Sequence, residues 1–124
     1  MNNPVGWFEI PVNDMDRAKK FYDAVFSIDI NIQDFGNLLM GWFPSDLESH
    51  GSSGTLVKAE SYVPSHEGTM VYFSVEEIDE VLPGIEPAGG KIINKKQSIG
   101  EYGFVAHFED CEGNRVALHQ RPKM

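Results

Sequence analysis

The sequence contains a single cysteine, Cys111, so no disulfide can form within the chain. It also lacks long apolar runs: none approaches the roughly 18 residues that a membrane-spanning helix needs. The first residues do not show the charged-then-apolar pattern of a secretory signal. We therefore expect a cytoplasmic protein in a reducing environment, with no membrane contact.

Basic residues are also scarce, with 10 Lys and Arg against 19 Asp and Glu, for a net charge of −9. The acidic residues are spread evenly along the chain and leave no basic patch that would neutralise phosphates. This excludes nucleic acid and anionic membranes as partners and is compatible with a cationic ligand. Phosphate-binding glycine loops, paired cysteines, zinc-binding helices and nucleophile elbows are absent as well.

What the sequence does contain is an internal repeat in a chain of single-domain size, 124 residues of which 41% are hydrophobic. The stretch FEIPVNDMD (8–16) aligns with VYFSVEEID (71–79) at an offset of 63 residues, about half the chain. Each copy reads as a short apolar strand followed by an acidic helix start. The repeat predicts one domain, 1–124, built of two tandem modules at about 5–61 and 69–121.

Both modules have the same predicted element order. In the first, Asn13 or Asp14 caps a helix, and strands follow at 29–35, 37–44 and 55–61. The apolar face of that helix has the following members: Met15, Ala18, Phe21, Tyr22, Val25 and Phe26. In the second module, a helix that starts near Ile78 is broken at Pro83 and Gly84. The remaining predicted elements are strands at 91–96, 103–109 and 115–120 and a hairpin turn at 110–114. The order is strand, helix and three strands, twice, which indicates an α+β fold.

Two motifs carry a resemblance to a known group of proteins: PVNDMDRAKKFYDAVF (11–26) near the start and FEDCEGNRVALH (108–119) near the end. In them the chain resembles the glyoxalase/bleomycin-resistance/extradiol-dioxygenase group, the vicinal oxygen chelate superfamily. The resemblance implies two βαβββ modules that form a cupped mixed sheet around a small-molecule ligand. It also implies a homodimer.

Enzymes of that superfamily usually hold a divalent metal in the cup. By resemblance, the positions of its ligands fall on Trp7, Met70 and Ala117 and near Leu56. An indole, a thioether, a methyl and an isobutyl group do not ligate such a cation. We therefore expect no cofactor at the usual metal site.

Other side chains can line the cup instead. Side chains alternate along a strand, so the residue two positions after each metal-ligand position lies on the same face of the sheet as that position. Those residues are Glu9, Lys58, Tyr72 and His119, which we expect to point into one cavity. Glu9 and His119 then form an acid/base pair, and Tyr72 donates a hydrogen bond to a developing oxyanion. The expected ligand-contact residues are Trp7, Lys58, Met70, His107 and Ala117. His107 lies on the face opposite Phe104, Ala106 and Phe108, and the sequence leaves open whether that face lines the cavity or a core.

Three functions remain open. The first is a glyoxalase-like lyase or isomerase that acts on a small oxygenated or aromatic molecule through Glu9 and His119, without the usual metal. The second is a non-catalytic protein that sequesters a drug or antibiotic, as bleomycin-resistance proteins do. The third is a metal-dependent lyase or dioxygenase with shifted ligands Glu9 and His119, which would need a third donor. A purely structural network of these polar groups is the non-functional alternative.

Overall fold

The computed structural model describes residues 4–46 and 51–122, and these residues follow the predicted order of elements twice. The elements of the first half are β1 (Phe8–Pro11), α1 (Met15–Phe26), β2 (Asn31–Asp34), β3 (Leu39–Trp42) and β4 (Gly54–Lys58). Those of the second half are β5 (Tyr72–Ser74), α2 (Ile78–Val81), η1 (Leu82–Gly84), β6 (Lys91–Ser98), η2 (Gly100–Tyr102), β7 (Phe104–Glu109) and β8 (Arg115–Gln120).

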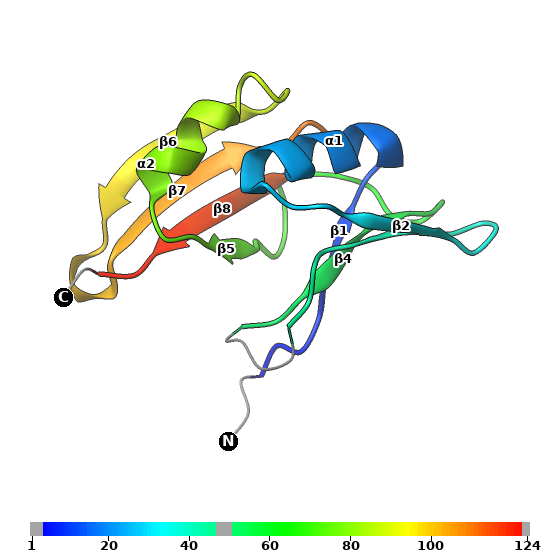
Figure 1. Ribbon diagram of the computed structural model, residues 1–124, viewed down its shortest axis with the longest axis horizontal. Coiled ribbons are helices and arrows are strands. Elements are labelled where there is room, and N and C mark those ends of the chain that lie inside the picture. The colour runs from blue at the N-terminus through cyan, green and yellow to red at the C-terminus, as the bar shows by residue number, and fades with distance from the viewer. Residues whose placement is uncertain (1–3, 47–50, 123–124) are drawn as a thin grey trace.

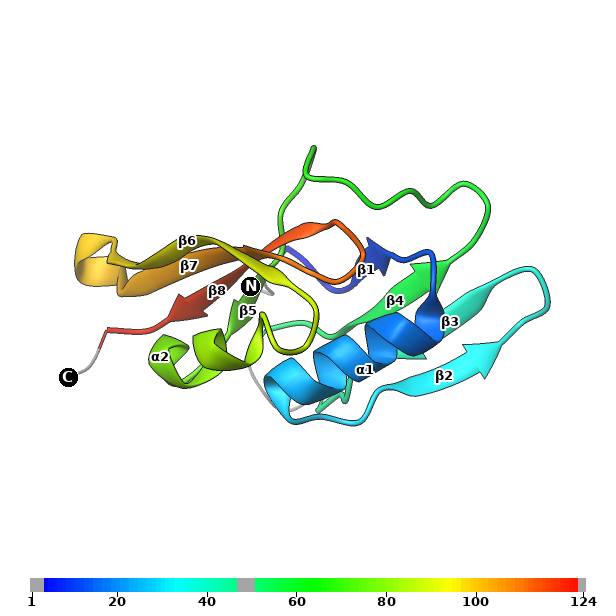
Figure 2. The ribbon, with the colours of Figure 1, turned by 90° about the horizontal axis from the view of Figure 1, so that it is seen from above.

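Each half forms its own four-stranded mixed sheet. The first sheet has the order β1-β4-β3-β2 and the second the order β5-β8-β7-β6. In both, the first strand of the module pairs in parallel with the last one, and the other pairs are antiparallel. The two sheets lie side by side, with both helices on the same side of the molecule (Figures 1 and 2). The predicted α+β fold of two βαβββ modules is confirmed.

Helix α1 forms where the sequence predicts it. The Asp14 side chain accepts a hydrogen bond from the Arg17 backbone N–H at 3.1 Å, which satisfies one of the free donors of the first turn. The helix ends at Ser27, whose left-handed backbone (φ 55°) closes the last turn. Five of the six residues predicted to form its apolar face are buried: Met15, Ala18, Phe21, Tyr22 and Val25.

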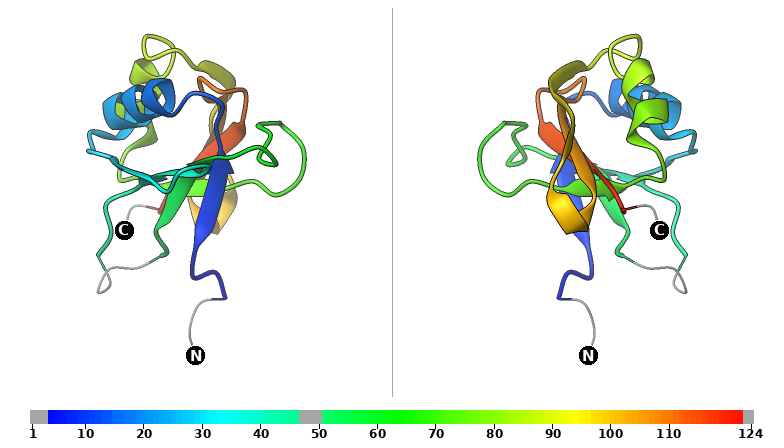
Figure 3. Two further views of the ribbon diagram at one scale, coloured as in Figure 1. Left: turned by 90° about the vertical axis from the view of Figure 1, so that its right-hand side faces the viewer. Right: turned by 90° about the vertical axis from the view of Figure 1, so that its left-hand side faces the viewer.

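The hydrophobic core is shared between the two modules. Phe21 of α1 packs on Phe108 of β7 with ring centroids 6.1 Å apart, and Tyr22 packs on Phe73 of β5 at 6.0 Å. The Tyr22 hydroxyl donates a hydrogen bond to the buried carboxylate of Asp110 at 2.6 Å. Burial and this carboxylate hold the pKa of Tyr22 well above its ordinary value. Figure 3 shows the two helices close together on one side of the sheets. The buried core residues of the helices pack against those of the strands.

The turn between β7 and β8 ties the second module to the start of α1. The buried Glu112 carboxylate accepts hydrogen bonds from the backbone N–H groups of Asn13 and Asp14 and from the Arg17 guanidinium. A carboxylate at this end of a helix meets unsatisfied N–H groups and the positive end of the helix dipole. The predicted hairpin turn is confirmed, and its Gly113 has φ +91°, a conformation that favours glycine.

The predicted break in the second helix is also confirmed. Helix α2 is a single turn, and the chain tightens into the 3₁₀ turn η1 at Pro83, which cannot donate to the preceding turn. The strands begin and end within a few residues of their predicted limits. No helix in the described ranges is long and apolar enough to cross a membrane.

Candidate functional site

Each sheet has one face packed against the core and one face turned away from it. On the outer face of the second sheet, side chains from β5, β7 and β8 line a cavity of about 470 Å³. We call it the histidine pocket; it is lined by Tyr72, Ser74, Gln97, Ile99, Val105, His107 and His119. The face of β7 that carries His107, which the sequence left open, is therefore the pocket face and not the core face.

His119 of β8 is oriented by a backbone carbonyl. Its Nε2 lies 2.8 Å from the carbonyl oxygen of Tyr102. Because a carbonyl only accepts hydrogen bonds, Nε2 must carry the ring proton of the neutral imidazole. Nδ1 then keeps its lone pair, and no partner for it occurs among the described residues. The pocket thus contains a proton acceptor held in a fixed orientation.

His107 of β7 joins Tyr72 to two further polar side chains. Its Nε2 lies 3.2 Å from the Tyr72 hydroxyl. Its Nδ1 lies 2.9 Å from Asn94 Nδ2 and 3.3 Å from Arg115 Nη2. Burial and the neighbouring Arg115 cation lower the pKa of His107 below its ordinary value. Both effects favour the neutral imidazole.

Ala117 explains how Tyr72 and His107 can meet. The register aligns Tyr72, Ala117 and His107 in one row across β5, β8 and β7. Ala117 is completely buried, and the Tyr72 and His107 rings lie edge to face with centroids 5.9 Å apart. A methyl group in the middle of the row leaves the space in which the two flanking side chains make contact.

Glu9 occupies the other sheet. It lies on the outer face of β1, exposed to solvent, and accepts a hydrogen bond from the Tyr62 hydroxyl at 2.8 Å. This carboxylate raises the pKa of Tyr62. The register aligns Glu9 with Thr55 and Trp42, and the Trp7 and Trp42 rings are 4.9 Å apart, edge to face. Glu9 is thus neither buried in the strand nor beside His119.

The expectation that four polar groups point into one cavity is wrong for Lys58. Lys58 shares its strand face with Leu56, and Leu56 packs in the core beneath α1. Glu9 pairs in register with Thr55, so its side chain shares a face with Thr55 and Val57 instead. The predicted metal-ligand position near Leu56 lies one residue beyond Thr55 on β4. Because side chains alternate along a strand, a shift of one residue moves each predicted side chain to the opposite face of the sheet.

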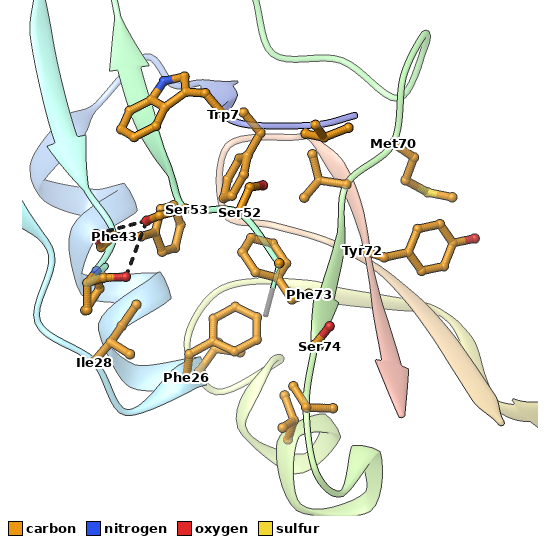
Figure 4. A pocket seen from close by; sticks show the side chains of 18 of the residues that line it. Trp7, Phe26, Ile28, Phe43, Ser52, Ser53, Met70, Tyr72, Phe73 and Ser74 are labelled. Atoms are coloured by element: carbon orange, nitrogen blue, oxygen red, sulfur yellow. Dashed lines mark hydrogen bonds between the residues drawn. The ribbon is translucent and has the colours of Figure 1, made fainter. Parts of the chain in front are cut away.

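A second, larger cavity of about 1250 Å³ lies between the edge strands β1 and β5. Figure 4 shows phenylalanine side chains on its floor, among them Phe26, Phe43 and Phe73, with Trp7 and Met70 near its rim. We call it the edge groove. Tyr72 projects from β5 away from the Phe73 side and lines both the edge groove and the histidine pocket. Of these two cavities, Glu9 lines the edge groove and His119 the histidine pocket, so the described part of a single chain does not assemble the expected acid/base pair.

Comparison with known proteins agrees with this architecture. The profile of the Glyoxalase/Bleomycin resistance protein/Dioxygenase superfamily matches residues 5–118. The chain belongs to this superfamily. A glyoxylase-like domain-containing protein of Didymella fabae is 26% identical over 98% of this chain and 97% of its own. The chain spans only 44% of the length of two mycobacterial relatives, which are 24% identical to it.

Solved structures share the fold at low sequence identity. A glyoxylase/bleomycin resistance protein/dioxygenase domain from Frankia sp. EAN1pec superposes with a TM-score of 0.75 at 15% identity, covering 98% of this chain and 100% of that one. TnmS3, an antibiotic binding protein from Streptomyces sp. CB03234, gives a TM-score of 0.71 at 22% identity, with 98% of both chains covered.

The resemblance to the superfamily assigns its metal-ligand positions to Trp7, Met70 and Ala117 and to a position near Leu56. Trp7, Met70 and Ala117 offer no suitable lone pair, and neither does Leu56 or its neighbour Thr55, whose neutral hydroxyl is a weak donor. Within residues 4–46 and 51–122, no group of three or more His, Cys, Asp or Glu side chains is placed to hold an ion.

Several groups that shape this site are not among the residues predicted from the sequence. Arg115 shares the strand alternation of Ala117 and His119, so that pattern was sufficient to place it on the pocket face. Asn94 and Gln97 come from β6, whose pairing with β7 is interrupted by register shifts. No local sequence pattern predicts these shifts. Tyr62 lies in the linker between the modules, where its contact with Glu9 depends entirely on the tertiary fold.

Proposed function

We propose that the protein binds a small carbonyl-bearing molecule in the histidine pocket and moves a proton on it, as a lyase or isomerase. The observation that carries this proposal is that His119, whose Nδ1 has no partner among the described residues, and the Tyr72 hydroxyl line the same cavity. One group accepts a proton and the other donates a hydrogen bond, and they stand on adjacent strands. Sequestration alone does not require a base held in one tautomer.

In the proposed reaction, His119 Nδ1 takes a proton from the carbon next to the carbonyl group. The electron pair of the broken C–H bond moves to the carbon–carbon bond, and the carbonyl oxygen becomes negative. Tyr72 stabilises that oxygen, and the imidazolium then returns the proton to the same carbon. In an α-hydroxy carbonyl compound the proton can instead go to the former carbonyl carbon, once the hydroxyl proton has moved to the negative oxygen and the hydroxyl carbon has become the new carbonyl. A positioned base contributes roughly 10²–10⁴ in rate, and one oxyanion donor roughly 10²–10³.

A second copy of the chain is part of the proposal, because Glu9 and His119 face different cavities. Among the described residues, the strands β1 and β5 each pair on one edge, and both border the edge groove. Large apolar side chains on the outer faces are exposed, including Trp7 at 41% and Tyr72 at 46%. We propose a homodimer in which the first sheet of one copy covers the second sheet of the other, and Glu9 joins the acid/base pair across that interface.

The reaction is tested by solvent-deuterium exchange. A panel of small α-hydroxy and α-keto carbonyl compounds is incubated with the protein in D₂O, and loss of the C–H signal is followed by ¹H NMR. We expect exchange into at least one class, reduced at least about a hundredfold in His119→Ala. The matched control is His66→Ala, which removes a histidine whose partner is Glu109 outside the pocket. Exchange that is unaffected by His119→Ala would overturn the assignment of the base.

Sequestration of a small molecule is the second candidate, favoured by the structural similarity to an antibiotic binding protein. It predicts that a ligand bound to the purified protein is released unchanged. Denaturing the protein and identifying any released compound by mass spectrometry separates the two candidates. A ligand recovered intact after long incubation in D₂O, without deuterium, supports sequestration.

We also propose that the activity needs no divalent metal, because the ligand positions of the superfamily hold side chains that do not ligate one. After equilibrium dialysis against zinc, nickel, manganese or iron, elemental analysis should find no stoichiometric metal on the protein. One tightly bound equivalent of any of them would contradict this and favour a metal-dependent lyase or dioxygenase with shifted ligands.

A further inference from the structure

The proton on His107 can be assigned from its neighbours. Arg115 Nη2 lies 3.3 Å from His107 Nδ1 and can only donate a hydrogen bond. Nδ1 must therefore present a lone pair. The Asn94 amide, 2.9 Å from the same atom, then turns its NH₂ group toward the ring, since its oxygen would require a proton on Nδ1. Two donors on Nδ1 leave the single proton of the neutral imidazole on Nε2.

This tautomer decides the direction of the hydrogen bond to Tyr72. The His107 Nε2–H group donates to the Tyr72 oxygen across 3.2 Å. The Tyr72 hydroxyl hydrogen is then unused by His107, and no other acceptor for it occurs among the described residues. Tyr72 therefore has a free O–H donor where its side chain borders the histidine pocket.

We infer that His107 is a positioning residue that fixes Tyr72 as a hydrogen-bond donor, so that the pocket selects ligands with a carbonyl or carboxylate oxygen at Tyr72. The inference deepens the proposed function and rests on it only in taking the histidine pocket as the ligand site. Ala117 makes the arrangement possible, because a larger side chain in that row would separate the Tyr72 and His107 rings.

The local charges agree with an oxygen ligand in spite of the net charge of −9. Burial and then Arg115 lower the pKa of His107, which favours the neutral ring and agrees with the acceptor role that Arg115 and Asn94 assign to Nδ1. Glu109, the neighbour of Arg115 across the β7–β8 pair, is hydrogen-bonded to His66 at 2.8 Å. Surface carboxylates beyond the Debye length of about 8 Å are screened at physiological salt, whereas the donors of the pocket act at contact.

The first test needs no ligand. The protein is labelled with ¹⁵N-histidine, and the two ring nitrogens of His107 are assigned by long-range ¹H–¹⁵N correlation, with His107→Gln to identify the signals. At neutral pH we expect Nε2 to show the shift of a protonated nitrogen and Nδ1 that of an unprotonated one. A proton on Nδ1, alone or in an imidazolium, would overturn the inference.

The second test compares two probes that share one aromatic ring, benzoate and benzylammonium. We expect benzoate to shift the Tyr72 and His119 resonances, and benzylammonium to bind at least about tenfold more weakly, because a cation cannot accept from Tyr72. Tyr72→Phe should weaken benzoate at least about tenfold, and His107→Phe several-fold. His107→Gln, which keeps an N–H donor at the place of Nε2, should restore most of the affinity.

Phe35→Ala serves as the control, because this exposed side chain of the first module does not line the histidine pocket, and it should leave benzoate binding unchanged. Equal affinity for the two probes, or full affinity in His107→Phe, would overturn the selection of an oxygen ligand. The outcomes separate the two proposals. If the tautomer and the preference for benzoate hold but no compound exchanges deuterium, the positioning role stands and the proton-transfer chemistry fails. If the proton lies on His107 Nδ1 while His119-dependent exchange occurs, the proton-transfer chemistry stands and the positioning role of His107 fails.

Discussion

At the scale of single residues, Cys111 shows how a carboxylate-rich turn suppresses reactivity. Burial, followed by the charges of Asp110 and Glu112, raises the pKa of this thiol to about 12. The thiolate is the reactive form, so at pH 8 its fraction is roughly a thousandfold below that of an ordinary cysteine. We predict slow alkylation by iodoacetamide in the folded protein and fast alkylation in guanidinium, measured by mass spectrometry. Similar rates in both would contradict this environment.

His107 links the chemistry of the pocket to the stability of the fold. Its pKa in the folded state lies below its ordinary value of about 6.5, so near that pH the unfolded chain binds more protons than the folded one. The stabilisation is present above the unfolded pKa and is lost as pH falls through it toward the folded pKa. Between about pH 7.5 and pH 5.5, the free energy of unfolding should therefore fall more steeply in the native protein than in His107→Gln.

Denaturant titrations at a series of pH values measure both slopes. All other ionisable groups are common to the two proteins, so the difference between the slopes isolates His107. Parallel slopes would show that the folded environment of His107, between Tyr72, Asn94 and Arg115, does not disfavour its charged form.

At the scale of elements, the sequence was informative where a pattern is local. The apolar face of α1, the break at Pro83 and the turn around Gly113 each follow from a few adjacent residues, and all three are confirmed. Lys58 was placed on the wrong face because the register of β4 is set by pairing with β1 and β3, about 45 and 15 residues away along the chain. The hydrogen bond between His107 and Tyr72 was not predicted for the same reason, since the two residues come from different strands.

The segment between η1 and β6 illustrates close packing between elements. A Cβ atom at Gly90 would lie 2.6 Å from the Glu109 carbonyl oxygen and 2.8 Å from the Phe21 ring. We predict that Gly90→Ala lowers the free energy of unfolding by about 1–3 kcal/mol, the scale of overpacking. Gly84→Ala is the matched control, because no atom of the described residues lies within 4 Å of a Cβ there. Equal stability of the two variants, by chemical denaturation, would mean that the segment moves away from α1 at little cost.

At the scale of the whole molecule, the two modules repeat one topology but do not have separate cores. Helix α1 of the first module places Phe21 and Tyr22 against β7 and β5 of the second. The Tyr22 hydroxyl also donates a hydrogen bond to Asp110. Removing either module would expose these aromatic rings to water and leave the buried Asp110 carboxylate without one of its donors. We therefore predict that the modules unfold together, in one cooperative transition.

The chain contains a separate probe for each module. Both tryptophans, Trp7 and Trp42, lie in the first module, and Cys111 lies in the second. Tryptophan fluorescence and the alkylation of Cys111, followed over one guanidinium series at a fixed protein concentration, should give the same midpoint. Tyr22→Phe, which keeps the ring but removes the hydrogen bond to Asp110, should shift both midpoints to lower denaturant by the same amount. If Cys111 became reactive at a denaturant concentration where the fluorescence is still native, the second module would unfold on its own. That result would contradict the prediction that the shared core makes the two modules unfold together.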